Sequence, residues 1–85
     1  MDLRVSREQY DAVRGARHLP DVLAKVLDGA SRTGDGYLLR LTYEEATALN
    51  ELCAWHVRTD AAGVVSPESR VFDELVQAIL THPEY

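Results

Sequence analysis

The stretch LRVSREQYDAV at residues 3–13 returns without gaps as LRLTYEEATAL at residues 39–49. Leu, Arg, Glu and Ala are identical in the two copies, and several other positions are conservative replacements. In each copy apolar residues alternate with arginine, which is typical of a half-buried strand. A hydroxyl residue then stands three positions before Gln9 or Glu45, which is the spacing of a helix capping box. Each copy therefore predicts a short strand that runs directly into a helix.

A second apolar, helix-like segment follows each copy, with a proline near its start at Pro20 and Pro67. Proline suits the first turn of a helix, where its missing N–H is not needed. The pattern predicts a mostly helical α+β fold built as a tandem β-α-α repeat (β-α-α-β-α-α), with a small two-stranded ribbon packed on four helices. A chain of 85 residues makes a single domain, 1–85, with 1–36 and 37–85 as its repeat units. Duplication and a chance match are equally good explanations of the repeat.

The expected elements follow from the caps and breakers. The predicted helices are 7–17, 20–28, 43–59 and 67–81, and the predicted strands are 3–5 and 37–41. A loop is predicted over 30–36, in which Gly34, Asp35 and Gly36 supply positive φ angles, and Gly63 is expected to end the third helix. Both outer edges of the ribbon are expected to lack a partner strand. The predicted core consists of Leu23, Val26, Leu27, Leu39, Leu41, Leu49, Leu52, Cys53, Phe72, Leu75 and Ile79.

Composition excludes several classes of protein. The chain is 46% apolar and 27% charged, which argues against disorder. Its net charge of −5 opposes non-specific binding to nucleic acid or to acidic membranes. It contains neither an apolar run of about 20 residues nor an N-terminal apolar segment typical of a signal peptide. A single cysteine excludes an internal disulfide, and we expect a cytoplasmic protein without a cofactor.

The sequence contains residues that could form a cysteine nucleophile or a metal site. Cys53 and His56 stand three residues apart, so they share a helix face and could form a thiolate–imidazole pair. Both fall on the apolar stripe of their helix, however, and a buried cysteine is ordinarily an inert packing residue. His18 and His82 lie elsewhere and are expected to be solvated, so the sequence predicts no metal site.

Two features indicate surface available to a partner. Trp55 lies about 100° away from the centre of the apolar stripe, so it either packs beneath a neighbouring helix or stands exposed beside Arg58. Exposed tryptophan and arginine are the residues enriched in binding hot spots. The helix expected at 67–81 is apolar over half its circumference, more than one buried stripe requires. The predicted partner-binding residues are Trp55, Arg58, Val76 and Leu80.

These observations favour a small non-enzymatic protein-interaction module, such as a regulator, inhibitor, immunity-type protein or accessory subunit. The partner is another protein, a second copy of the chain, or both, and a homodimer is favoured because it would cover the open strand edges. The alternatives are a nucleic-acid-binding regulator and an enzyme that uses Cys53 and His56. The nucleic-acid surface would comprise Arg4, Arg7, Arg14, Arg17 and His18.

Overall fold

Three strands form an antiparallel sheet in the N-terminal half of the chain. They are β1 (Asp2–Ser6), β2 (Ser31–Thr33) and β3 (Gly36–Arg40), in the order β1–β3–β2. In this computed structural model, which describes residues 1–85, β2 lies inside the stretch 30–36 that was expected to be a loop. The predicted two-stranded ribbon is therefore wrong, whereas the α+β class, with about 52% helix, is confirmed.

A two-residue turn joins β2 to β3 and explains why a loop-like sequence forms a strand pair. Gly34 has a φ of 51° and Asp35 a negative φ, the combination found in type II′ hairpin turns. Asp35 does not have the positive φ that was expected of it, and neither does Gly36. Gly36 begins β3 instead, where the absence of a Cβ lets the backbone pass close to the Val5 carbonyl oxygen. The short, polar β2 carries no periodic apolar signal, so pattern alone does not reveal it.

Side chains bind two of the backbone groups on the outer edge of β1. The N-terminal ammonium of Met1 donates to the Leu41 carbonyl, and the Leu41 N–H donates to the Met1 carbonyl. In the alternating antiparallel pattern, the backbone N–H and C=O groups of Leu3 and Val5 therefore also point toward β3. Of the backbone groups that point outward, the Asp2 carbonyl accepts from His82 Nε2, and the capping box occupies the Ser6 N–H. The expectation of two open edges is therefore wrong for β3, part of which pairs with β2, whereas β1 lies at an edge of the sheet without a partner strand, as expected.

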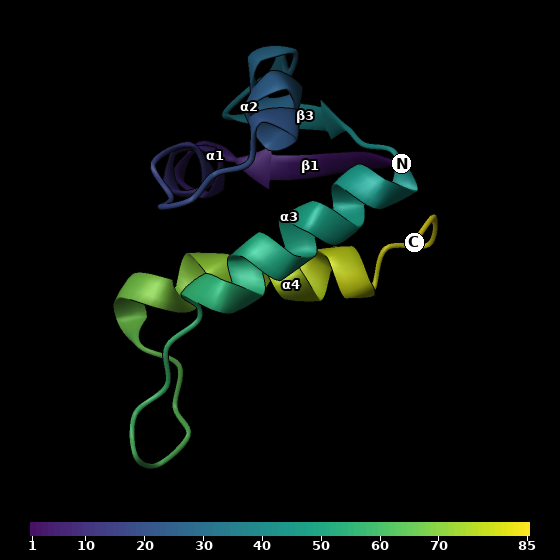
Figure 1. Cartoon of the computed structure of the whole chain (residues 1–85). Coiled ribbons are helices and arrows are strands. Elements are labelled where there is room, and N and C mark those ends of the chain that lie inside the picture. The colour runs from purple at the N-terminus through teal and green to yellow at the C-terminus, as the bar shows by residue number, and fades with distance from the viewer.

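Four α-helices form near the places where the capping residues and prolines predict helix starts. They are α1 (Arg7–Arg14), α2 (Asp21–Asp28), α3 (Tyr43–His56) and α4 (Arg70–Leu80), the last preceded by a 3₁₀ turn, η1 (Pro67–Ser69). In Figure 1, α3 and α4 lie side by side below the sheet, and α2 lies at the opposite end of the molecule. Helix α1 contacts α4 as well as the sheet, and α2 contacts α3.

The helix ends differ from those predicted, for local reasons. Helix α1 ends at Arg14 because Gly15 is its C-cap. The prediction that Gly15 lies inside a helix extending to residue 17 is therefore wrong. Helix α3 stops at His56 because the chain then turns toward η1, where the Ser69 hydroxyl accepts from the Arg58 N–H and donates to the Arg58 carbonyl. Gly63 lies beyond this point, at a φ of 80° in a projecting hairpin closed by the bridge between Thr59 and Val65.

The core lies between one face of the sheet and the helices. Burial alternates along β1, so that Leu3 and Val5 point inward while Asp2, Arg4 and Ser6 are exposed. Of the residues predicted to be buried, Val26 and Phe72 are only half-buried but still pack against the core, and the others are buried. The observed core consists of Leu3, Val5, Val13, Leu23, Leu27, Leu39, Leu41, Ala46, Leu49, Leu52, Cys53, Leu75 and Ile79.

Both predicted capping boxes are present. The Ser6 hydroxyl accepts from the Gln9 N–H, and the Thr42 hydroxyl accepts from the Glu45 N–H, while each Gln or Glu side chain accepts from the N-cap backbone. We expect Thr42→Ala to lower the free energy of unfolding by about 1 kcal/mol, and Ser6→Ala by the same or less because α1 is shorter.

Urea denaturation measures both effects. Ser31→Ala is the matched control, since this exposed hydroxyl makes no hydrogen bond, and it should leave stability unchanged within about 0.5 kcal/mol. Equal stabilities of all three variants and the wild type would contradict the structural role of the boxes.

Candidate functional site

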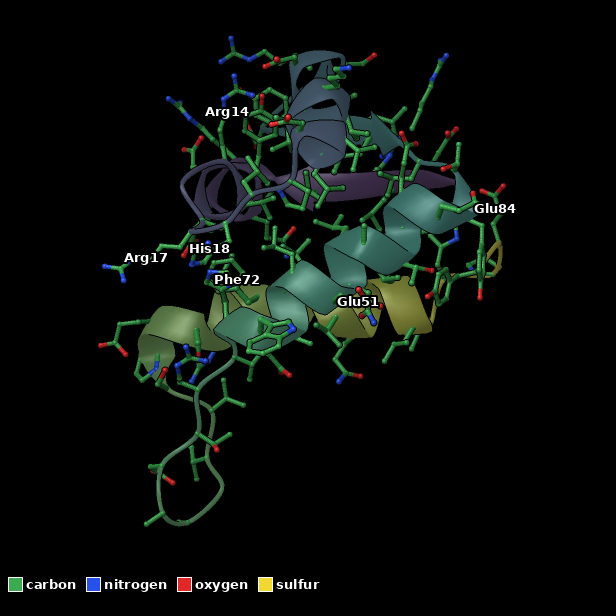
Figure 2. All side chains as sticks on the ribbon, in the orientation of Figure 1. Arg14, Arg17, His18, Glu51, Phe72 and Glu84 are labelled. Carbon is green, nitrogen blue, oxygen red and sulfur yellow. The ribbon has the colours of Figure 1, made fainter.

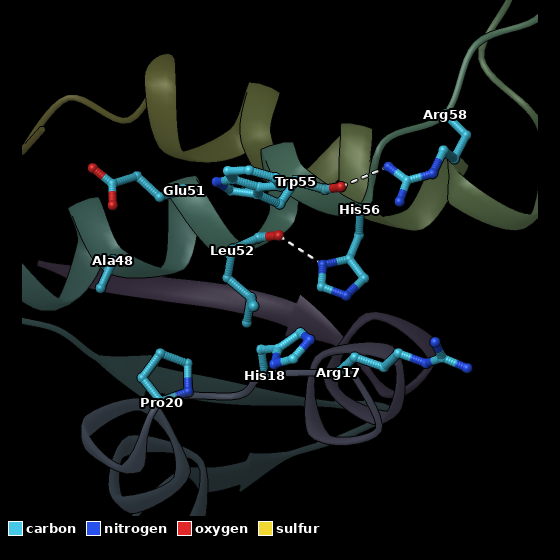
Figure 3. Close-up of a pocket in the computed structure, with 9 residues that line it drawn as sticks. All are labelled: Arg17, His18, Pro20, Ala48, Glu51, Leu52, Trp55, His56 and Arg58. Carbon is cyan, nitrogen blue, oxygen red and sulfur yellow. Dashed lines mark hydrogen bonds between the residues drawn. The ribbon is translucent and has the colours of Figure 1, made fainter.

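A cleft of about 600 Å³ lies between α3 and the connection from α1 to α2 (Figure 3). The connection contributes Arg17, His18 and Pro20. Helix α3 and the residues just after it contribute Ala48, Glu51, Leu52, Trp55, His56 and Arg58. Pockets of this size lie in the range that holds small ligands or the side chains of a bound peptide.

The spacing of the α3 residues explains why they share the cleft. Ala48, Glu51, Leu52 and Trp55 follow one another at intervals of three, one and three, which places them on one side of a helix. The adjoining side carries Ala46, Leu49 and Cys53 into the core. Leu52 belongs to both surfaces, because it is buried in the core and also lines the cleft.

Trp55, the only tryptophan, is 78% exposed. The sequence left open whether Trp55 packs beneath a neighbouring helix or is exposed, and in the structure it is exposed. Arg58 lies beside it, and its Nη1 donates to the carbonyl oxygens of Trp55, at 2.6 Å, and Val57, at 3.3 Å. Arginine at this position satisfies carbonyls that the end of α3 leaves without an intrahelical donor. The same contacts hold the guanidinium at the edge of the cleft.

The other two candidate residues lie outside the cleft. Val76 is half-buried and packs against the core, whereas Leu80 is 55% exposed near the end of α4. Most of the broad apolar face of α4 is covered by other parts of the molecule, because α4 packs against both α1 and α3. The structure thus brings Trp55 and Arg58 together and leaves Leu80 as a separate exposed residue.

Two histidines face each other across the cleft in Figure 3. His56 Nδ1 donates to the Leu52 carbonyl at 2.8 Å, since a carbonyl oxygen only accepts, and its ring rests against Phe72 with centroids 5.0 Å apart. His56 therefore presents Nε2 as its second polar atom. His18 has a φ of 61° and is the one non-glycine residue in the left-handed region, a conformation that other side chains seldom adopt.

Charge is divided along the cleft. Glu51 lies at one end, and Arg17, His56 and Arg58 lie toward the other, with Trp55 and Leu52 between them (Figure 3). Figure 2 shows the same division from another direction, with Arg17 and His18 near the C-terminal end of α3 and Glu51 farther back along the helix. The surface is therefore apolar in the middle and carries opposite charges at its ends.

Cys53 is not placed for nucleophilic chemistry. Its side chain is fully buried, and burial raises the pKa of its thiol to about 12. His56 is bonded to the backbone of Leu52 and not to the thiol. No three histidine, cysteine or carboxylate side chains lie close enough together to hold a metal ion. His82, which was expected to be solvated, is half-buried and joins the end of α4 to β1 through the Asp2 carbonyl.

The raised pKa of Cys53 predicts slow labelling and a pH-dependent stability. At pH 8 the folded protein should contain about a thousandfold less thiolate than the unfolded chain, so a disulfide reagent should label it only after unfolding. The folded state holds the proton more tightly, so stability should fall as the pH rises from about 9 to about 12.

The control is Cys53→Ala, which should show a smaller loss of stability over the same pH range. Labelling of the native wild type as fast as that of the protein in urea would contradict the buried position of the thiol.

The arginines of α1 are only partly available for nucleic acid. Arg14 Nη2 binds Asp28 Oδ1 at 2.6 Å, which raises the pKa of Arg14, and it also donates from Nη1 to the Tyr10 hydroxyl. Arg7 lies 3.9 Å from Asp11. Arg17 lines the cleft. Two of the residues counted in the nucleic-acid alternative, Arg7 and Arg14, therefore have acidic partners within the chain.

Sequence reasoning missed the contribution of the α1–α2 connection to the cleft. Arg17 and Pro20 are more than 25 residues away from Ala48 along the chain, and no local pattern links them. The helical spacing of Ala48, Leu52 and Trp55 is the one signal that indicates a shared surface.

Comparisons with known proteins do not supply a relative: no family model matches the chain, and neither a curated protein nor a solved structure matches it. None of the helices is at once long enough and apolar enough to span a membrane.

Proposed function

We propose that this chain is a small protein-interaction module that binds its partner through Trp55, Arg58 and the adjoining cleft. The observation that carries the proposal is the exposure of Trp55 at the rim of a cleft. A large apolar side chain left in water contributes nothing to the core, but it gains free energy when a partner covers it. Tryptophan and arginine side by side are the residue types on which binding energy concentrates.

Affinity capture from an extract of the source organism tests this proposal. Wild type, Trp55→Ala, Leu80→Ala and Val64→Ala should be immobilised in parallel, after their melting curves show that all four are folded. We expect a stoichiometric partner to be retained by wild type and by Val64→Ala, an exposed residue of the projecting hairpin, and to be lost with Trp55→Ala. Loss with Leu80→Ala alone would move the binding surface to α4, and retention by Trp55→Ala would contradict the proposal.

A homodimer is a separate proposal for the chain on its own. The outer edge of β2 has no neighbouring strand and carries neither proline nor lysine, and Leu80 is exposed on α4. A two-fold pairing of either surface would leave the cleft free. Light scattering coupled to gel filtration at micromolar concentration should give the mass of two chains, and the mass of one chain would contradict the dimer.

The tandem repeat is likewise a proposal. It is supported by the pairing of Leu3 with Leu39, since these two residues occupy equivalent positions in the repeated stretches and are direct partners in the sheet. An approximate two-fold axis through that pair would relate α1 to α3 and α2 to α4. Such an axis would turn the contact between α1 and α4 into a contact between α3 and α2, and both contacts are present.

A further inference from the structure

We infer that the Trp55 cleft receives an acidic segment of another protein, which places an apolar side chain against Trp55 and Leu52 and a carboxylate at the end of the cleft that Arg17 and Arg58 line. This inference rests on the proposed function and adds the chemistry of the partner.

The basic end of the cleft carries charge that the chain itself does not neutralise. The salt bridges of the molecule join Arg7 to Asp11 and Arg14 to Asp28, and neither involves Arg17 or Arg58. Arg58 spends donors of Nη1 on backbone carbonyls but keeps its charge and its remaining N–H groups. Two arginines that line the same cleft without a carboxylate partner give this end of the cleft a positive charge that attracts an anionic side chain.

Two histidines line the cleft at the same place. His56 is fixed by its bond to the Leu52 carbonyl and by the Phe72 ring, so Nε2 is the polar atom left to contact a ligand. His18 has a left-handed backbone, and its ring points toward Leu52 and His56 in Figure 3.

The apolar middle of the cleft argues against a bare anion as the occupant. A cleft of about 600 Å³ is much larger than one phosphate or carboxylate, and Leu52, Pro20 and the Trp55 indole offer nothing that such an ion can use. A peptide segment fills both parts, because one side chain supplies the carboxylate and its neighbour supplies the apolar contact.

The negative charge of Glu51 disfavours nucleic acid as the occupant and favours one orientation of a bound acidic segment. A polyphosphate backbone along the cleft would run past this carboxylate, and the net charge of the chain opposes it further. A peptide whose acidic residue lies at the arginine end avoids Glu51 and can place a basic residue or a free N–H group beside it.

Selection from a phage-displayed library of random dodecapeptides tests this inference without knowledge of the natural partner. The folded wild type is the target, and Trp55→Ala is used for counter-selection. We expect the selected peptides to share an Asp or Glu next to a large apolar residue. A selected peptide, synthesised with an acetylated N-terminus and an amidated C-terminus, should change the fluorescence of Trp55 saturably. Its Asp→Asn or Glu→Gln version should bind about tenfold more weakly.

Matched variants locate the site. Arg17→Gln should weaken the peptide about tenfold, whereas Arg40→Gln, an exposed arginine on β3, should not change its affinity. His18→Gly removes the imidazole while suiting the left-handed backbone, so it should weaken binding without lowering the melting temperature.

Several outcomes would overturn the inference: no enrichment, enrichment of peptides without acidic residues, or equal weakening by Arg17→Gln and Arg40→Gln. Saturable quenching of Trp55 by inorganic phosphate or by oligothymidine at least as strong as that by the peptide would assign the cleft to a small anion or to nucleic acid. A fluorescence change on dilution of the protein alone would assign it to a second copy. Retention of a captured protein that Trp55→Ala loses would leave the proposed function standing in each case.

Discussion

Replacing Leu49 by Ala should lower the free energy of unfolding by about 3–5 kcal/mol. Leu49 is 1% exposed in the centre of the core, so its removal leaves a cavity that the surrounding side chains cannot readily fill. A loss of that size is a large part of the stability of a small domain. Urea denaturation followed by circular dichroism measures it.

Leu52→Ala is the informative comparison. Leu52 is 8% exposed and borders the cleft, where water can enter the space left by the side chain. We expect a smaller loss, about 2–3 kcal/mol. Unchanged stability of both variants would remove this face of α3 from the core, and a larger loss at Leu52 than at Leu49 would contradict the position of the cleft.

Gly36→Ala should lower the free energy of unfolding by about 2–4 kcal/mol. A Cβ at position 36 would overlap the carbonyl oxygen of Val5 and approach the backbone of Ser6, so β1 and β3 would have to separate at this point. The variant should also lose β-sheet signal around β1, which amide hydrogen exchange can detect as faster exchange.

Gly15→Ala is the matched control for this prediction. It also adds one methyl group to a glycine, but at a φ of −89° and at an ordinary contact distance of 3.4 Å from the nearest atom, the Asp11 carbonyl oxygen. It should be neutral or stabilising by up to about 1 kcal/mol. Equal losses at positions 15 and 36 would contradict the close approach of β1 to β3.

The sequence predicts well where local chemistry decides the structure. The hydroxyl residues Ser6 and Thr42, each followed three positions later by Gln9 or Glu45, fix the starts of α1 and α3, and the structure contains both boxes. Apolar periodicity also identifies most of the core, because a residue on the inner stripe of a helix has nowhere else to go. Val26 and Phe72 depart from this pattern only in being half-buried at the edge of the core.

What the sequence does not predict depends on contacts between distant residues. Strand β2 exists because β3 supplies its hydrogen-bond partners, and its own residues would not indicate a strand. The apolar width of α4 indicated free surface, but α1 and α3 together cover it except at Leu80. The cleft beside Trp55 needs the α1–α2 connection to approach α3, and this is a property of the fold.

Fluorine NMR of the chain labelled with 5-fluorotryptophan tests the binding role of Trp55 most directly. The single tryptophan gives one resonance, which for the free protein should shift between water and deuterium oxide as expected of an indole that is 78% exposed. In the complex with the captured partner, we predict a new resonance that has lost this solvent shift, because the partner covers the indole. A resonance that keeps its position and its full solvent shift in a saturated complex would contradict the account.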